Sequence, residues 1–299
     1  MFRNVLVGVG DPEGGRDAIA LAEMLRATDV GELTLAHVFR GEGGPYRWRD
    51  PRVAERRQQV RALLERAASD SGVPAHIRWH SASSVGRGLH ELAEMVGADL
   101  LVLGSSRRGL FGRVALGHDT RAALNGAPCA IAIAPVAYFS EPRPPMREVG
   151  VGYDGSPESE HALGVARDIA AELGSKLSAF EAVSIPAYIY VGASAPVEAS
   201  AIGRVVAIAR NRIAALGGVE PHAAYGDAVE ELTSYSASLD LLVVGSRGYG
   251  PLGRLVHGST AGHLASTARC PLLVLTRRAR TSSAPAESED RQEAAPAAV

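Results

Sequence analysis

The chain has 299 residues, of which 46% are hydrophobic and 21% are charged, and it carries a formal net charge of −2. This length favours two domains, each large enough to bury its own core. The near-neutral charge argues against non-specific binding of nucleic acid, which needs a basic surface. The apolar runs are too short to cross a bilayer and Asp11 comes too early for a signal peptide, so we expect a cytoplasmic protein without nucleic-acid or membrane partners.

Strands and helices alternate along the first half of the chain. Apolar segments at 5–9, 98–105 and 129–133 predict three of its strands. His76 and His80 are expected on a further strand. Because no carboxylate or cysteine joins them in the sequence, the pattern favours surface histidines, and no metal ligands are predicted.

The second half repeats this alternation. Its first helix is predicted to begin at Pro157, with Ser156 as N-cap and Gly174 at its end, because apolar residues recur between them at intervals of three and four. The expected strands lie at 148–153, 176–183, 219–225, 239–245 and 271–276, and further helices lie at about 202–216, 227–237 and 261–268.

Segments of the two halves match one another. The stretch at 98–105 matches 239–246, and the strands that begin at Cys129 and Cys270 also match, so the chain contains a tandem repeat. The two cysteines are too few for a structural zinc site and are expected as small buried core residues. Five near-continuous apolar strands separated by helices in each half predict an α/β fold with two doubly wound, five-stranded parallel sheets.

Composition also predicts the domain boundaries. A proline-rich segment separates domain 1 (1–136) from domain 2 (147–277), with the linker at 137–146. Residues 278–299 lack apolar periodicity and predict a disordered tail. The last strand of each half would leave an apolar edge if it were unpaired, so we expect the halves to associate as an intramolecular pseudo-dimer. Association of two chains into a homodimer stays open.

A glycine loop after the fourth strand of the second half is the most informative motif. Gly245-Ser246-Arg247-Gly248 is followed, after nine residues, by Gly258-Ser259-Thr260. Glycines allow the backbone to approach an anion, and the following helix N-terminus directs free N–H groups towards negative charge, which predicts a phosphate-binding loop. The G-x-G-x-x-G string at 248–253 is a coincidence because it does not join a first strand to its helix, and no P-loop motif occurs.

The spacing of this loop, G-x2-G-x9-G-[ST], resembles that of ATP-binding members of the universal stress protein family. The family's other marker, an aspartate at the end of the first strand, is matched by Asp154 within the segment 151–157. The resemblance covers both halves, so the chain looks like a tandem universal stress protein with two domains of the adenine nucleotide alpha hydrolase-like fold. Doubly wound sheets in general bind ligands at the carboxyl ends of their strands, where both motifs are expected.

The resemblance implies ATP as the ligand and leaves open whether Mg²⁺ accompanies it. It places the adenosine near Asp154 and Gly155, and the adenine against the backbone of Ala182 and Val183. The phosphates would follow the two glycine segments, which comprise Gly245, Ser246, Arg247, Gly248, Gly258, Ser259 and Thr260. Taken singly, Asp154 could merely shape a turn, and hydroxyl residues at a helix start could be ordinary caps. The agreement of all these groups at one sheet edge favours a binding site.

In the first half the motif's second glycine and its final hydroxyl pair are replaced, and the aspartate position differs too. Gly10 stands where the second half has Asp154, and Arg107 stands where it has Gly248. His118-Asp119 replaces the serine–threonine pair, and a carboxylate near a helix start repels phosphate. We therefore expect the first half to keep the fold and to bind ATP weakly or not at all, which leaves one competent site per chain.

These features favour an ATP-binding regulatory or stress-response protein over an enzyme. No residue is assigned a catalytic role because no general base or water-positioning group accompanies the motif, and at most slow hydrolysis is expected. An ATP-hydrolysing or nucleotidyl-transferring enzyme is the first alternative, although neither a Ser-Gly-Gly-x-Asp-Ser loop nor a His-x-Gly-His pair occurs. A non-binding interaction scaffold is the second, and the complete motif of the second half argues against it.

Overall fold

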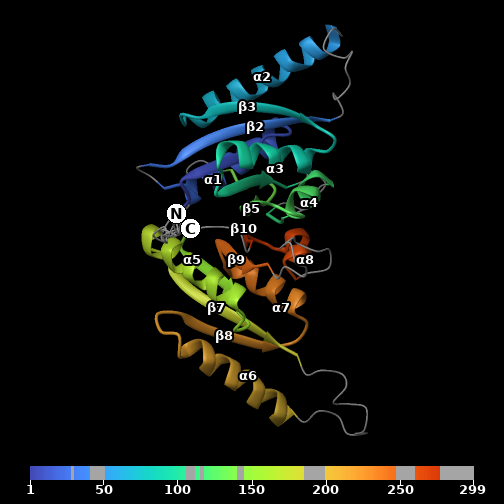
Figure 1. The fold of residues 1–299 in the computed structure, drawn as a ribbon. Helices are drawn as coiled ribbons and strands as arrows, with labels where there is room; N and C mark the ends of the chain where they lie inside the picture. The colour runs from blue at the N-terminus through green and yellow to red at the C-terminus, as the bar shows by residue number, and fades with distance from the viewer. Residues whose placement is uncertain are drawn as a thin grey trace, which may run out of the picture.

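The computed structural model describes residues 1–27, 30–40, 51–105, 112–114, 118–139, 145–184, 199–246 and 260–276. Ten strands in these ranges form one continuous sheet in the order β3-β2-β1-β4-β5-β10-β9-β6-β7-β8 (Figure 1). The first half contributes β1 (Asn4–Gly8), β2 (Glu32–Arg40), β3 (His76–Ala82), β4 (Leu100–Gly104) and β5 (Ala130–Ala134). The second half contributes β6 (Glu148–Gly152), β7 (Lys176–Val183), β8 (Glu220–Tyr225), β9 (Leu241–Gly245) and β10 (Leu272–Leu275).

Helices cover both faces of this sheet, with α2 and α6 at its two far ends (Figure 1). The helices of the first half are α1 (Pro12–Leu25), α2 (Pro51–Ser71), α3 (Val85–Val96) and α4 (His118–Leu124). Those of the second half are α5 (Pro157–Leu173), α6 (Ala199–Ala214), α7 (Ala228–Tyr235) and α8 (Thr260–Thr267). One buried core lies between the sheet and α1, α2, α5 and α6, and the other lies between the sheet and α3, α4, α7 and α8.

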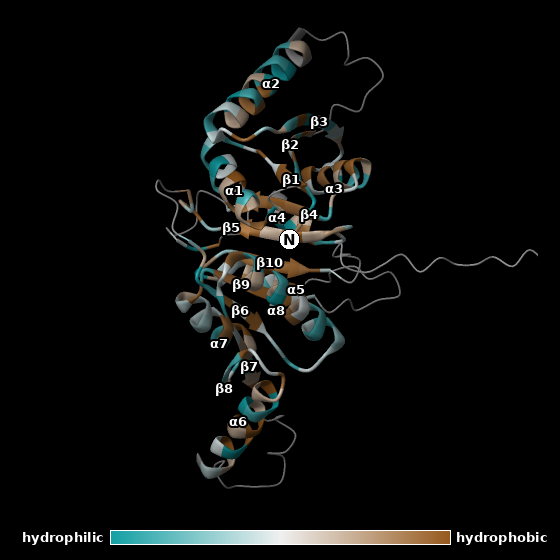
Figure 2. Cartoon of the chain, turned by 90° about the vertical axis from the view of Figure 1, so that its left-hand side faces the viewer, coloured by the Kyte–Doolittle hydropathy of each residue, from teal (hydrophilic) through white to brown (hydrophobic). Residues whose placement is uncertain are grey.

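Within each half the strands are parallel and the sheet is doubly wound. β1 lies between β2 and β4, and β6 lies between β7 and β9. Because both faces are covered, the central strands are apolar along their whole length, and Figure 2 shows them in brown against more polar outer helix surfaces. The predicted fold class is confirmed in both halves.

The two halves meet where β5 and β10 pair side by side in antiparallel directions. Ile133 is opposite Leu272, and Ile131 is opposite Val274. The last strands of the two halves are therefore paired within the chain. Away from these strands, Val114 donates its backbone N–H to the carbonyl of Ala268 at 2.9 Å, which joins the first half to the end of α8.

The predicted limits of α5 are confirmed by its hydrogen bonds. The Ser156 side chain accepts from the N–H of Ser159, and Pro157 occupies the first turn, where no N–H is needed. Gly174 ends the helix in the left-handed conformation, at φ 66°, which glycine adopts without strain.

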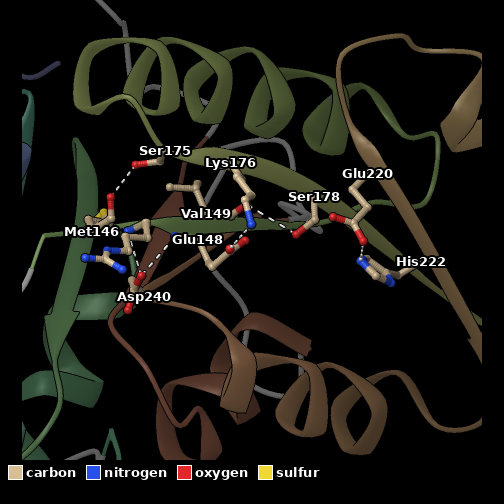
Figure 3. A network of polar contacts seen from close by, with 10 residues as sticks. Met146, Glu148, Val149, Ser175, Lys176, Ser178, Glu220, His222 and Asp240 are labelled. Carbon is tan, nitrogen blue, oxygen red and sulfur yellow. Dashed lines mark hydrogen bonds and ion pairs between the residues drawn. The ribbon is translucent and has the colours of Figure 1, made fainter.

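At the amino ends of the strands, a matched pair of aspartates ties neighbouring strands together. Asp240 accepts from the N–H groups of Arg147 and Glu148 at 2.7 and 3.0 Å (Figure 3). In the first half, Asp99 accepts from the N–H groups of Arg3 and Asn4 at 2.8 and 3.0 Å. In the sequence both aspartates look like ordinary strand residues. Because the same contact occurs in both halves, we assign it a structural role.

Cys129 and Cys270 are buried free thiols, as expected from the sequence. Burial raises the pKa of the Cys129 thiol to about 12 and also raises the pKa of Cys270. Within the described ranges, no helix is both long and apolar enough to cross a membrane. The predicted domain boundaries stay a prediction. Residues 278–299, expected as a disordered tail, lie outside the part of the chain that the structure describes.

Candidate functional site

A cavity of about 450 Å³ lies at the carboxyl ends of the second half's central strands. Since the strand order is β9-β6-β7, the cavity extends from the end of β7, across β6, to the end of β9. Its walls come from these strand ends and from the starts of α5, α7 and α8. The lining residues are Gly152, Tyr153, Asp154, Ser156, Glu158, Ser159, Phe180, Ala182, Ser184, Ala228, Leu232, Val244, Gly245, Thr260 and Ala261.

Four of the residues that the sequence singled out come together in this cavity: Asp154, Ala182, Gly245 and Thr260. The other three are 28 to 106 residues away from Asp154 in the sequence, and the strand order alone brings them to one edge. Gly155, Val183 and Ser246 lie directly beside lining residues but do not line the cavity. Arg247, Gly248, Gly258 and Ser259 lie outside the described residues.

Asp154 stands in the turn between β6 and α5. The next residue, Gly155, has φ 75°, a conformation that side chains other than glycine rarely adopt. One carboxylate oxygen of Asp154 accepts from the N–H of Ser156 at 3.0 Å. Ser156, not Asp154, then caps the helix. The hydrogen bond within the turn therefore gives Asp154 a structural role. The exposed carboxylate of Asp154 also borders the cavity.

Gly245 has a packing reason to be glycine, independent of any ligand. A Cβ at this position would lie 2.5 Å from the carbonyl oxygen of Glu158, so β9 can approach the start of α5 only because the side chain is absent. In the first half, a Cβ at Gly104 would overlap the carbonyl oxygen of Gly14 in the same way. This shared contact explains why the first half keeps Gly104 although the second glycine of its motif is replaced.

Ser246 is buried and its N–H donates to the carbonyl of Leu275 at 2.9 Å, which fixes the start of the glycine loop on β10. The first half has the same bond between Ser105 and Ala134, at 3.0 Å. The Gly-Ser pair after the fourth strand therefore has a structural role in both halves. The difference between the halves begins after this pair.

Several lining residues were missed from the sequence. Phe180, Ala228 and Leu232 form an apolar wall between β7 and α7, and Glu158 adds a second carboxylate at the start of α5. One signal was available: Asp227 caps α7, accepting from the N–H groups of Val229 and Glu230, and it marks a helix start at the same sheet edge. Nothing in the sequence indicated how deep the apolar wall would be.

A buried polar group supports the floor of the cavity on the side of α5 and α6. The Tyr153 hydroxyl donates to Glu160, and burial together with this bond raises the pKa of Tyr153 to about 12. Nearby on β7, the buried Glu181 is paired with Arg212 of α6 through both of its oxygens. The carboxylate of Glu181 is thus neutralised, as a buried charge requires.

The histidine prediction needs one correction. His76 and His80 lie on β3 as expected, but a carboxylate contacts one of them: His80 Nε2 is 2.7 Å from Glu91 Oε2 on α3. Arg87 and His80 both hold the pKa of Glu91 below its usual value. This contact links two neighbouring elements, β3 and α3. Over the described residues, no group of three or more His, Cys, Asp or Glu side chains could hold a metal ion.

The sequence profile described as the universal stress protein family matches this chain twice, at residues 1–135 and 146–276. The chain belongs to the universal stress protein family. The two matches lie on the two halves of the sheet, so it is a tandem member.

Relatives of this universal stress protein include several from mycobacteria. One from Mycobacterium bovis is 32% identical over 183 residues, and the aligned part spans 59% of this chain and 61% of the relative's length. One from Mycobacterium tuberculosis is 27% identical over 288 residues, spanning 90% of this chain and 95% of the relative.

Solved structures share the fold over nearly the whole chain. A universal stress protein from Archaeoglobus fulgidus superposes with a TM-score of 0.64 at 16% identity, covering 92% of this chain and 98% of that one. One from Pseudomonas aeruginosa gives a TM-score of 0.60 at 18% identity, covering 92% of this chain and 93% of that one. At these identities the similarity concerns the fold.

Proposed function

We propose that the second half binds ATP in the cavity at the carboxyl ends of β6, β7 and β9, and that the chain is a nucleotide-dependent regulatory protein of its family. One observation carries the proposal. The cavity is lined jointly by Asp154, Ala182, Gly245 and Thr260, four residues that the family resemblance assigns to a nucleotide site. Doubly wound sheets take ligands at this edge, next to the strand where the order reverses.

The described residues fit an adenine nucleotide in size and polarity. The volume of about 450 Å³ is within the usual range for small-molecule sites, roughly 300–1,000 Å³. The β7 side is apolar, through Phe180, Ala182 and Leu232, and suits a purine ring. The polar lining comes from the β6–α5 turn and the start of α5, and beyond β9 the wall ends at Thr260, where the N-terminus of α8 suits phosphate groups.

In this proposal Asp154 accepts a hydrogen bond from the ribose and Gly155 shapes the turn that presents it. Ala182 and Val183 border the base, and Gly245, Ser246 and Thr260 begin and end the phosphate loop. Arg247, Gly248, Gly258 and Ser259 complete that loop and stay predictions from the sequence, as does any Mg²⁺ on the phosphates. A cytoplasmic location and homodimer formation also stay predictions.

The enzyme alternative is kept as an outcome because Glu158 places a carboxylate in the cavity that the sequence did not reveal. A carboxylate within reach of a bound water is a candidate base for hydrolysis. We nevertheless propose a binding protein, since the motif includes no dedicated water-positioning group.

Calorimetric titration of the full chain with ATP and Mg²⁺ tests the proposal. We expect one site per chain, and product analysis should show no multiple turnover. Asp154→Asn should weaken ATP binding by about tenfold or more, because a hydrogen bond to a charged group contributes about 1.5–3 kcal/mol. Asp11→Asn is the matched control: Asp11 caps α1 by accepting from the N–H groups of Glu13 and Gly14, so ATP affinity should stay unchanged.

Two sites per chain would contradict the prediction of one competent half. No binding would favour the scaffold alternative, and sustained turnover at an enzyme-like rate would favour the enzyme. Equal affinity of the Asp154→Asn variant and the wild type would remove Asp154 from the site.

A further inference from the structure

The two halves can be compared residue by residue around the cavity. Strand registers make Gly8 the counterpart of Gly152, because Gly8 pairs with Leu103 and Ala36 while Gly152 pairs with Val244 and Phe180. Two residues further along each second strand, Val38 therefore corresponds to Ala182.

The helix caps align α3 with α7. Ser84 caps α3 and Asp227 caps α7, so Val85 corresponds to Ala228 and Leu89 to Leu232. The glycine surroundings agree, because Leu89 lies nearest to Gly8 after Leu103, and Leu232 lies nearest to Gly152 after Val244.

At the place of the cavity, three positions carry larger side chains in the first half, whereas Phe180 of the second half is larger than its counterpart Ala36. Val38, Leu89 and Leu103 are 7%, 3% and 5% exposed and belong to one buried cluster. Their counterparts include Ala182 and Val244, which line the cavity of the second half. Val85 likewise stands where Ala228 lines it.

Two glycines allow α3 to lie close to its neighbours. A Cβ at Gly88 would overlap Val38 Cγ1 on β2, and a Cβ at Gly86 would lie 2.5 Å from the carbonyl carbon of Ala122 on α4. The counterparts of these glycines on α7 are Val229 and Glu231, whose side chains cannot be accommodated at such a distance. Helix α3 therefore rests directly on β2 and α4, whereas α7 carries bulkier residues at the corresponding positions.

We infer that the close packing of α3 on β2, through Gly88 and Val38, excludes nucleotides from the first half. The altered glycine loop is then not needed to explain why the first half would not bind ATP. The residues that decide which half binds a ligand are Val38, Gly86 and Gly88 in the first half and Ala182, Val229 and Glu231 in the second. The ligand part of this inference rests on the proposed function, and the packing part does not.

Single cysteines test the packing part without any nucleotide. Ala182→Cys and Val38→Cys are made in the full chain and treated with a thiol reagent under native conditions; Cys129 and Cys270 are buried, so the wild type serves as the blank. We expect Cys at 182 to react about tenfold faster or more than Cys at 38, because thiol reactivity follows exposure. Equal rates would overturn the inference.

ATP protection of the cysteine at 182 separates the two proposals. Slower labelling in the presence of ATP supports both. If Cys at 182 reacts faster than Cys at 38 and ATP leaves both labelling rates unchanged, the proposed function is contradicted. The packing inference is then still supported.

Substitutions that reduce the cavity of the second half test the part of the inference that concerns ATP. Ala182→Val with Glu231→Gly introduces the first half's residues and leaves Asp154 and the glycine loop intact. We expect the affinity for ATP to fall by about tenfold or more, because a packed site tolerates added methyl groups poorly. The control, Ala223→Val with Glu230→Gly, makes the same replacements on β8 and the exposed face of α7, and it should bind as the wild type does.

Thermal unfolding of both double variants confirms that they are folded. Unchanged ATP affinity in the closed variant would show that the loop, not helix packing, decides between the halves. If the closed variant does not fold, Ala182→Val alone gives the same comparison with its single control, Ala223→Val.

Discussion

Tyr153 is a buried acid whose environment favours its neutral form. It is 5% exposed, its hydroxyl donates to Glu160, and its pKa is raised to about 12. An ordinary tyrosine has a pKa of about 10, so between these values the unfolded chain has lost the proton that the folded chain keeps. The folded state then binds more protons, and its stability falls as pH rises.

The stabilisation linked to Tyr153 is fully present below about pH 10 and is lost as pH rises towards about 12. In Tyr153→Phe the free energy of unfolding should fall less steeply over this range, while near pH 7 it should be lower by about 1 kcal/mol through the lost hydrogen bond. Urea unfolding from about pH 7 to about 11.5 measures both effects.

Tyr225→Phe is the control for this experiment, since Tyr225 is an exposed residue of β8. Its alkaline profile should follow that of the wild type. Burial also raises the pKa of Tyr235, so some alkaline loss will remain in Tyr153→Phe. An unchanged slope in that variant would contradict the assignment to Tyr153.

At the scale of elements, Gly88 offers a direct measure of how closely α3 packs on the sheet. In an exposed helix, replacing glycine by alanine stabilises by up to about 1 kcal/mol. At Gly88 the new Cβ would overlap Val38, so Gly88→Ala should instead destabilise by about 1–3 kcal/mol.

Val38→Ala should relieve the destabilisation caused by Gly88→Ala. On its own it removes buried methyl groups and should cost about 2 kcal/mol. In that background Gly88→Ala should be neutral or stabilising, giving a coupling of about 1–3 kcal/mol in a double-mutant cycle. Gly203→Ala on α6 is the control, because nothing lies within 4 Å of the added Cβ, and it should stabilise. Additive effects at 38 and 88 would contradict the contact.

Local signals predicted the elements of this fold well. The N-cap Ser156, the helix end at Gly174 and the apolar strands follow from neighbouring residues, and the structure has them where the sequence expects them. The meeting of Asp154, Gly245 and Thr260 at one cavity also followed, since parallel strands end at the same sheet edge.

Contacts between distant residues were not predictable in this way. The role of Gly88 depends on its contact with Val38, 50 positions earlier, which no local pattern around Gly88 indicates. Asp240 read as one polar residue in an apolar strand, although it holds the start of β6. Gly245 was assigned to phosphate alone, while its approach to Glu158 gives it a packing role as well.

At the scale of the whole molecule, the pairing of β5 with β10 makes the two halves one sheet. Each buried core contains residues from both halves, so neither half has a core that ends at its own last strand. The contact between Val114 and Ala268 adds a link outside the strands, at 2.9 Å. Shared cores of this kind favour unfolding of the two halves together.

We therefore expect a single calorimetric transition, with equal calorimetric and van't Hoff enthalpies. ATP at about 100 times its dissociation constant should raise the stability of the whole chain by about 2.7 kcal/mol, although it binds only the second half, because both halves unfold in the same step. Differential scanning calorimetry with and without ATP measures this. Two transitions, of which ATP moves only one, would show that β5 and β10 separate before either half unfolds.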